Sequence, residues 1–155
     1  MEPFPRRPPR MTLFQRTQPF YFLTFNTWNR QRLLADERIH NAFVSFCTRA
    51  HETYHVAVGR YVIMPDHIHL FVYFPEEGIP FVRWVQSLKS TLGKCLLASG
   101  HDKPHWQDGF FDHVLRSAES YSQKWDYVRR NPERAGLCDN ADDWTWQGEI
   151  VKVEF

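Results

Sequence analysis

The chain has 155 residues, a net charge of +1 and a hydrophobic fraction of 43%, which suits one globular domain and excludes a disordered protein. Its three cysteines show no Cys-x-x-Cys spacing, no apolar run approaches the ~20 residues of a membrane span, and the first residues lack the apolar region of a signal peptide. We therefore expect a cytoplasmic protein without a disulfide framework, a zinc knuckle or a membrane segment, and a charge this close to neutral does not by itself indicate a nucleic-acid binder.

The two ends of the chain differ in composition from its middle. Residues 1–18 are rich in proline and arginine, which predicts a basic arm without a core of its own. Residues 19–147 are expected to form the domain. Residues 148–155 alternate between polar and apolar side chains, and this pattern fits either an edge strand or a loose tail.

The domain begins with a predicted strand over 20–28, which is dense in aromatic and β-branched residues. Asp36 then caps a predicted helix. Its apolar residues recur at helical spacing: Ile39, Phe43, Phe46, Ala50 and Tyr54. A strand over 56–64 follows, and it leads through the turn at 65–66 into a further strand, with which it pairs as an antiparallel hairpin.

A second helix is predicted to start at Pro80, because proline suits the first helical turn. Its apolar stripe is Phe81, Val85, Leu88, Leu92 and Leu96. A fourth strand follows over 110–116, and Ser120 with Gln123 resembles the capping box of a third helix. This element order predicts an α+β, ferredoxin-like antiparallel sheet with helices on one face, and it leaves the opposite face open.

The second strand of the hairpin carries the most informative motif, His67-Ile68-His69. Because side chains alternate along a strand, the two histidines project from one face, while the apolar face is formed by Ile68, Leu70, Val72 and Phe74. Two imidazoles then converge on one point in front of the sheet. Taken alone, the pair fits two half-buried histidines on a polar face better than a metal site, so a metal site needs a third group.

The third helix offers a candidate for that group. Its apolar stripe is Tyr121, Trp125 and Val128, and Tyr127 falls more than roughly 100° away from it. The helix is expected to end near Asn131, because Pro132 follows, and Asn131 lies one turn after Tyr127. Two imidazoles and one amide oxygen would leave positions on a divalent metal open for substrate, as catalytic centres do, with Tyr127 as the candidate nucleophile. The alternative is an exposed tyrosine and an ordinary asparagine at a helix end.

Several motifs then follow one another in a fixed order. They are MPDHIH (64–69), WQ (106–107), FFDHVLR (110–116) and YVRRNPERAGL (127–137). Over residues 11–147 this set resembles the single-tyrosine HUH transposases, and within them the REP-associated tyrosine transposases. The resemblance implies a metal-dependent endonuclease and strand transferase that acts on single-stranded DNA near hairpins through a 5′-phosphotyrosine.

The same resemblance assigns roles to individual residues. It implies His67, His69 and Asn131 as ligands of Mg²⁺ or Mn²⁺ and Tyr127 as the nucleophile, and imidazole ligands favour Mn²⁺ of the two ions. The expected partner is single-stranded or hairpin DNA, and the protein is expected to be a monomer or a homodimer whose tyrosine serves its own site or that of a partner. Candidate phosphate contacts are Lys89, Lys94, Arg116, Arg129, Arg130 and the N-terminal arginines. Either Trp28 or Trp106 is a candidate for stacking an unpaired base.

Other functions fit the sequence less well. A histidine-triad nucleotide hydrolase needs a third alternate histidine, and Phe71 stands at that position. A serine hydrolase needs a Gly-x-Ser-x-Gly motif, which this sequence does not contain. The serious rival is a host-retained protein that binds structured single-stranded DNA through the same fold without cleaving it.

Overall fold

Five antiparallel strands form the central sheet of the computed structural model, which describes residues 7–13 and 19–155. The strands are β2 (Phe20–Asn26), β3 (Ala57–Ile63), β4 (His67–Tyr73), β5 (Phe111–Leu115) and β6 (Gln147–Glu149). They lie in the order β5-β2-β4-β3-β6, so β4 is the central strand and pairs with β2 on one side and β3 on the other. The predicted hairpin of β3 and β4 is confirmed.

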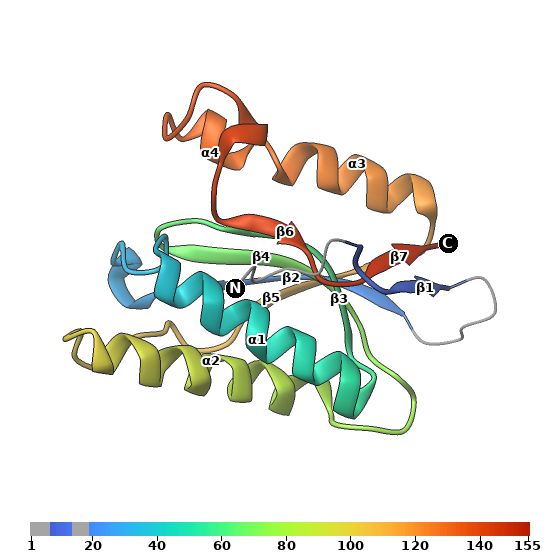
Figure 1. Cartoon of the computed structure of the whole chain (residues 1–155), viewed down its shortest axis with the longest axis horizontal. Helices are drawn as coiled ribbons and strands as arrows, with labels where there is room; N and C mark the ends of the chain where they lie inside the picture. Colours follow the sequence, from blue (N-terminus) through green and yellow to red (C-terminus); the bar gives the residue numbers. More distant parts are fainter. Residues whose placement is uncertain (1–6, 14–18) are drawn as a thin grey trace.

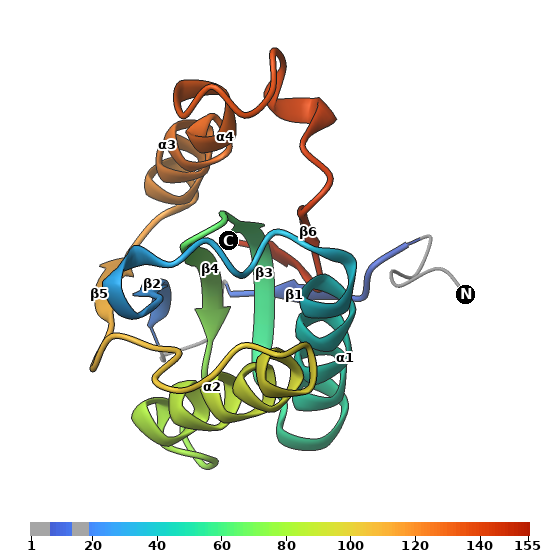
Figure 2. The same ribbon diagram turned by 90° about the vertical axis from the view of Figure 1, so that its left-hand side faces the viewer.

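Helices cover both faces of this sheet. Helices α1 (Glu37–Tyr54) and α2 (Phe81–Ala98) lie side by side against one face, whereas α3 (Ala118–Val128) and the short α4 (Asn131–Arg134) lie over the other (Figure 1 and Figure 2). The predicted α+β sandwich is confirmed, with α1 and α2 as the two helices on one face. The face that the sequence leaves open is partly covered, because Tyr121 of α3 packs on Phe71 of β4 with ring centroids 4.8 Å apart.

The first two helices form where the sequence predicts them. The carboxylate of Asp36 accepts a hydrogen bond from the backbone N–H of Ile39 at 2.9 Å, which caps the start of α1. The stripe of α2 is buried at Val85, Leu88, Leu92 and Leu96, and Trp84 joins it. Tyr54, which the periodicity places on the packing face of α1, is exposed at the last turn of that helix.

The start of the third helix differs from its prediction. Ser117 and not Ser120 is the capping residue, because Ser117 has the extended backbone that a cap requires and Ser120 is already helical. The side chain of each serine hydrogen-bonds the backbone N–H of the other, at 3.0 and 3.1 Å. Gln123, the predicted partner, instead donates to the carboxylate of Glu119.

Short elements bring the two ends of the described chain together. Strand β1 (Arg10–Thr12) pairs in parallel with β7 (Lys152–Glu154), so both segments are strands here, and the rest of the predicted arm at 1–6 and 14–18 lies outside the described residues. A single turn of 3₁₀ helix, η1 (Trp28–Arg30), follows β2, and another, η2 (Ala141–Asp143), precedes β6. Among the described residues, no helix has the length and apolar character needed to cross a membrane.

Leu70 tests how much the sheet depends on its central strand. Its side chain is fully buried in the core, so replacing it with alanine leaves a cavity. We expect Leu70→Ala to lower the free energy of unfolding by about 2–5 kcal/mol in urea denaturation. The control is Leu97→Ala on α2, where the leucine is 49% exposed and the expected change is within about 0.5 kcal/mol. Equal effects of the two substitutions would contradict this packing.

Candidate active site

Strand β4 presents two imidazoles on the face of the sheet that lies under α3 and α4. His67 and His69 are half-buried, and Ile68 between them is fully buried on the opposite face. The two Nε2 atoms lie 3.1 Å apart, and the rings meet edge to face with centroids 4.6 Å apart. The alternation of a β-strand thus brings the reactive nitrogens to one point, as the motif predicts.

In each of the two imidazoles, the nitrogen that faces away from this point, Nδ1, is hydrogen-bonded to a neighbouring side chain. The Nδ1–H of His67 donates to the carboxylate of Asp66 at 2.7 Å, and the guanidinium of Arg30 donates to the same carboxylate at 2.9 Å. Nδ1 of His69 and the hydroxyl of Thr24 are hydrogen-bonded at 2.7 Å. Such partners fix the orientation of a ligating imidazole and leave its Nε2 lone pair available.

Sequence reasoning missed these three supporting residues, although two of them left a signal. Asp66 precedes His67 directly. Thr24 is the register partner of His69 across the β2–β4 pair, so it would follow from a correct alignment of the two strands. Arg30 lies 36 residues from Asp66, and only the folded chain brings them together.

Asn131 meets the imidazoles from above. Its side-chain N–H groups point at Nε2 of His69 at 2.8 Å and at Nε2 of His67 at 3.3 Å. The structure therefore brings together all three predicted ligand side chains, two from β4 and one from the first position of α4. The amide also carries an oxygen on the same carbon, which is the atom that a cation would take.

The helix that was predicted to carry both Tyr127 and Asn131 is broken between them. α3 ends at Val128, three residues before the predicted end, and Asn131 begins α4. Proline at position 132 has no N–H to offer to the carbonyl of Val128, so a continuous helix would lose a hydrogen bond there. Near this break, the guanidinium of Arg134 donates a hydrogen bond to the backbone carbonyl of Tyr127 at 2.8 Å.

Tyr127 lies on the exposed side of this break. Its side chain is 62% exposed, and the guanidinium carbon of Arg134 lies 4.1 Å from the centre of its ring. Within residues 7–13 and 19–155 its hydroxyl has no hydrogen-bond partner, and its ring contacts neither imidazole. The phenol is therefore accessible to a ligand, and Arg134 is its neighbour.

Burial and positive charge keep both imidazoles neutral. Burial, together with the charges of His67, Lys124, Arg134 and Arg30, lowers the pKa of His69 to about 3. Burial also lowers the pKa of His67, although the carboxylate of Asp66 opposes this shift. Burial alone would raise the pKa of Asp66, but its hydrogen bonds from His67 and Arg30 lower it overall. Neutral imidazole is the form that binds metals.

The donor set suits a divalent cation with open coordination positions. Within the described parts of the chain, no group of three His, Cys, Asp or Glu side chains could hold a metal, so an ion at this place would need the amide as well. With metal–nitrogen bonds of about 2.0–2.1 Å, two ligand nitrogens on one ion lie about 3 Å apart. The measured separation of 3.1 Å between the two Nε2 atoms fits that arrangement.

The predicted phosphate contacts have different environments. The ammonium of Lys89 donates to the backbone carbonyls of Gln107 and Gly109 at 3.1 and 2.6 Å, so it holds the loop before β5. Arg129 forms ion pairs with Asp126 and Asp142. Exposed side chains are found at Lys94, Arg116 and Arg130. Among the N-terminal arginines, Arg10 forms an ion pair with Glu154.

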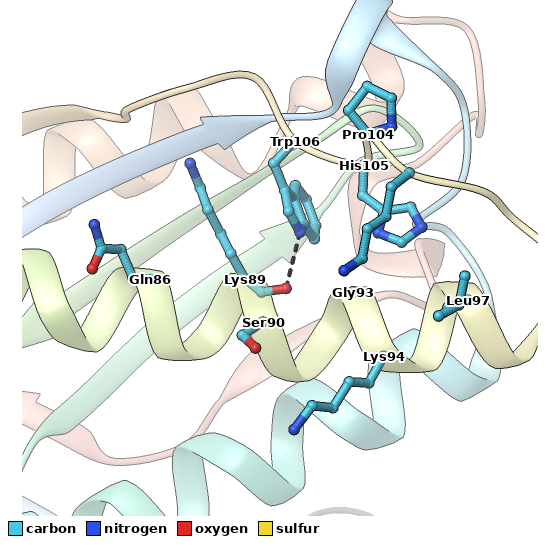
Figure 3. A pocket seen from close by; sticks show the side chains of 10 residues that line it. Gln86, Lys89, Ser90, Gly93, Lys94, Leu97, Pro104, His105 and Trp106 are labelled. Atoms are coloured by element: carbon cyan, nitrogen blue, oxygen red, sulfur yellow. Dashed lines mark hydrogen bonds between the residues drawn. The ribbon is translucent and has the colours of Figure 1, made fainter.

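A groove of about 710 Å³ runs along α2, on the face of the sheet opposite the imidazoles, with Lys89, Lys94 and Trp106 among its lining residues (Figure 3). The indole N–H of Trp106 donates to the carbonyl of Lys89 at 2.9 Å, and its ring packs edge-on against Phe25. Trp106 is therefore held in place by the fold, whereas Trp28 is 42% exposed.

The lowered pKa of His69 predicts a dependence of stability on pH. Because its pKa is lower in the folded protein than the ordinary 6.5, protons bind the unfolded chain preferentially. This contribution is complete above pH 6.5 and is lost as the pH falls toward 3. We expect wild type to lose about 1–2 kcal/mol more than His69→Gln between pH 7 and pH 5. Urea denaturation in EDTA measures it.

A matched control for this titration is His113→Gln, which removes an exposed histidine of β5 and should retain the wild-type loss. Identical losses in wild type and His69→Gln would mean that His69 is not held neutral by the fold.

Comparison with known protein families gives a match over most of the chain. The model of the family described as "Transposase IS200 like" matches residues 17–131. A protein of Haemophilus influenzae named "Putative REP-associated tyrosine transposase" is 25% identical over 147 residues, which cover 87% of this chain and 83% of that protein.

Solved structures share the fold. A REP-associated tyrosine transposase bound to a REP hairpin matches with a TM-score of 0.69 and 22% identity, over 95% of this chain and 82% of the other. A structure described as a "putative transposase" from Deinococcus radiodurans R1 matches with a TM-score of 0.51 and 15% identity, over 73% of this chain and 90% of that one. Because the family model spans well over half of the sequence, the chain belongs to the IS200-like transposase family, and its role is that of a transposase.

Proposed function

We propose that this protein cleaves and rejoins single-stranded DNA next to hairpins through a covalent bond between Tyr127 and a 5′ phosphate. In this proposal His67, His69 and Asn131 hold a divalent cation, Mg²⁺ or Mn²⁺. The observation that carries the proposal is the convergence of three ligand side chains at one point beneath α3 and α4, with an exposed phenol one turn before Asn131. The solved relative with this fold binds a REP hairpin, which supports hairpin DNA as the substrate here.

The side chains around the imidazoles would orient the phosphate that reacts. Thr24 and Asp66 hold the outer nitrogens of the two imidazoles, so that both Nε2 lone pairs face the same point. The bound cation supplies a Lewis acid for a non-bridging phosphate oxygen. Asn131 would complete the ligand set from α4, and a phosphate held by such an ion would lie within reach of the side chains around the imidazoles.

Tyr127 provides the nucleophile. Its hydroxyl oxygen bonds to phosphorus and gives its proton to solvent. The bond from phosphorus to the 3′ oxygen breaks, and that oxygen takes up a proton from solvent and leaves as a 3′-hydroxyl. The 5′ phosphate stays on Tyr127. A 3′-hydroxyl of another strand reverses the step and joins the new ends without ATP, because the phosphodiester energy is kept in the tyrosine link.

Arg134 positions this nucleophile. Its guanidinium lies over the ring of Tyr127 and also hydrogen-bonds the carbonyl of the same residue. The positive charge of the Arg134 guanidinium therefore stays beside the phenol, where the negatively charged phosphate has to approach. Since Tyr127 is exposed, its side chain can turn toward a bound strand without leaving a cavity in the core.

Adduct formation tests the proposal. Labelled single-stranded oligonucleotides from the flanks of the protein's own gene are incubated with the protein and MnCl₂ or EDTA. We expect a covalent protein–DNA band with MnCl₂, none with EDTA and none with Tyr127→Phe, because the phenyl ring has no oxygen to bond phosphorus. The matched control is Tyr54→Phe at a similarly exposed tyrosine of α1, which should leave the adduct unchanged.

The rival function gives a different result in the same experiment. A protein that only binds structured single-stranded DNA would retain the oligonucleotide and form no adduct at any metal concentration, and Tyr127→Phe would not alter its binding.

Thr24 tests the cation site separately from the chemistry. Thr24→Val removes the hydroxyl that holds Nδ1 of His69 and keeps the shape of the side chain. We expect the affinity for Mn²⁺ to fall roughly 10- to 100-fold, measured by calorimetric titration without DNA. Thr91→Val on α2, also a half-buried threonine, is the control and should bind Mn²⁺ as wild type does. Unchanged affinity in Thr24→Val would place the ion elsewhere.

A further inference from the structure

The edge strand β5 places an aromatic side chain on the same face as the imidazoles. Phe111 of β5 is the register partner of Thr24 on β2, and Thr24 is the register partner of His69 on β4. Side chains of directly paired residues point to the same face of a sheet. Phe111 therefore stands in one row with Thr24 and His69, two strands and about 10 Å from the imidazole.

Phe111 is exposed, although α3 shields other aromatic residues on the same face of the sheet. Its side chain is 58% exposed, and its ring meets Phe22 edge-on with centroids 6.5 Å apart. Further along the same face, Tyr121 of α3 packs on Phe20 and Phe71 and shields them from solvent. Figure 2 shows β5 at the edge of the sheet below α3. An aromatic face is thus left open beside the candidate active site.

The side chain of Lys124 lies over Phe22, which is two residues before Thr24 on β2 and on the same face of the sheet. The ammonium of Lys124 is 4.8 Å from the centre of Phe22, and Phe22 in turn stacks on His69 with centroids 5.3 Å apart. Within the described ranges, Lys124 takes part in no ion pair. Its charge is therefore available to an anion that lies between Phe111 and the imidazoles.

We propose that Phe111 stacks an unpaired base of the DNA strand next to the scissile phosphate, and that Lys124 contacts the phosphate of that nucleotide. The proposal rests on the proposed function, because it takes single-stranded DNA as the substrate. Every nucleobase has a flat face that an aromatic ring can stack, and each carries an anionic phosphate. The exposed ring of Phe111 and the ammonium of Lys124 beside the imidazoles match these two groups. Of the two tryptophans considered from the sequence, Trp106 is already engaged by Lys89 and Phe25.

DNA binding in EDTA tests base stacking on Phe111, which we call the base platform, in the absence of DNA cleavage. The probe is a fluorescent hairpin oligonucleotide with single-stranded flanks from the protein's own gene, and the dissociation constant is measured by anisotropy. We expect Phe111→Ala to weaken binding roughly 5- to 100-fold, and Phe111→Trp to stay within about threefold of wild type. Val82→Ala, a similarly exposed apolar residue of α2 on the opposite face, should bind as wild type does.

An abasic scan separates stacking from a structural role. Removing the base at one flank position should weaken binding by wild type as much as Phe111→Ala does, and should leave the affinity of Phe111→Ala unchanged. A variant that is merely misfolded would lose affinity at all positions alike. If Lys124 contacts a phosphate, Lys124→Gln should make the plot of log affinity against log salt shallower, with a slope that is less negative by about 0.7.

Each outcome bears on the proposal. It is overturned if Phe111→Ala binds within twofold of wild type, if no flank position couples to Phe111, or if the substitution changes only the oligomeric state in light scattering, which would make the patch an interface between two copies. Coupling at one position without any Tyr127 adduct would refute strand transfer and keep the base platform. An adduct without coupling would refute the platform alone. A wild-type protein that binds no single-stranded DNA would contradict both.

Discussion

A continuous helix from Ala118 onward would need an N–H at position 132 for the carbonyl of Val128, and proline has none. α3 therefore ends at Val128, and the chain turns before α4 begins at Asn131. This break directs two neighbouring side chains to different places. Asn131 reaches down to the imidazoles at 2.8 and 3.3 Å, while Tyr127 stays at the surface under the guanidinium of Arg134. The ligand side and the nucleophile side of the candidate site both depend on this turn.

The sheet supplies the rigid half of the site. β4 lies at the centre of five strands, and its apolar face is buried under α1 and α2, so the two histidines cannot change faces without exposing Ile68 and Leu70. Thr24 and Asp66 then fix the ring orientations. A site built on a central strand in this way is already ordered before a ligand arrives, which lowers the free energy cost of binding.

Much of this could be predicted from local patterns, and the rest required contacts distant in sequence. Strand alternation predicts the shared face of His67 and His69, and helical periodicity places Tyr127 off the packing face of α3, where it is exposed. The stack of Arg134 on Tyr127 joins the last turn of α3 to the end of α4, and the folded chain was needed to see it. The capping role of Ser117, which the sequence assigns to Ser120, depends on where β5 stops. Lys89 resembles a free phosphate contact in sequence, yet its ammonium holds the carbonyls of a loop about twenty residues away.

The central claim is that both imidazoles and the Asn131 amide converge on one cation. Crystals grown with MnCl₂, measured near the manganese absorption edge, test this claim directly. The account predicts one strong anomalous peak within coordination distance of Nε2 of His67, Nε2 of His69 and the side-chain oxygen of Asn131. A structure with manganese bound elsewhere, or with the Asn131 amide still donating to the imidazoles at saturating MnCl₂, would contradict it.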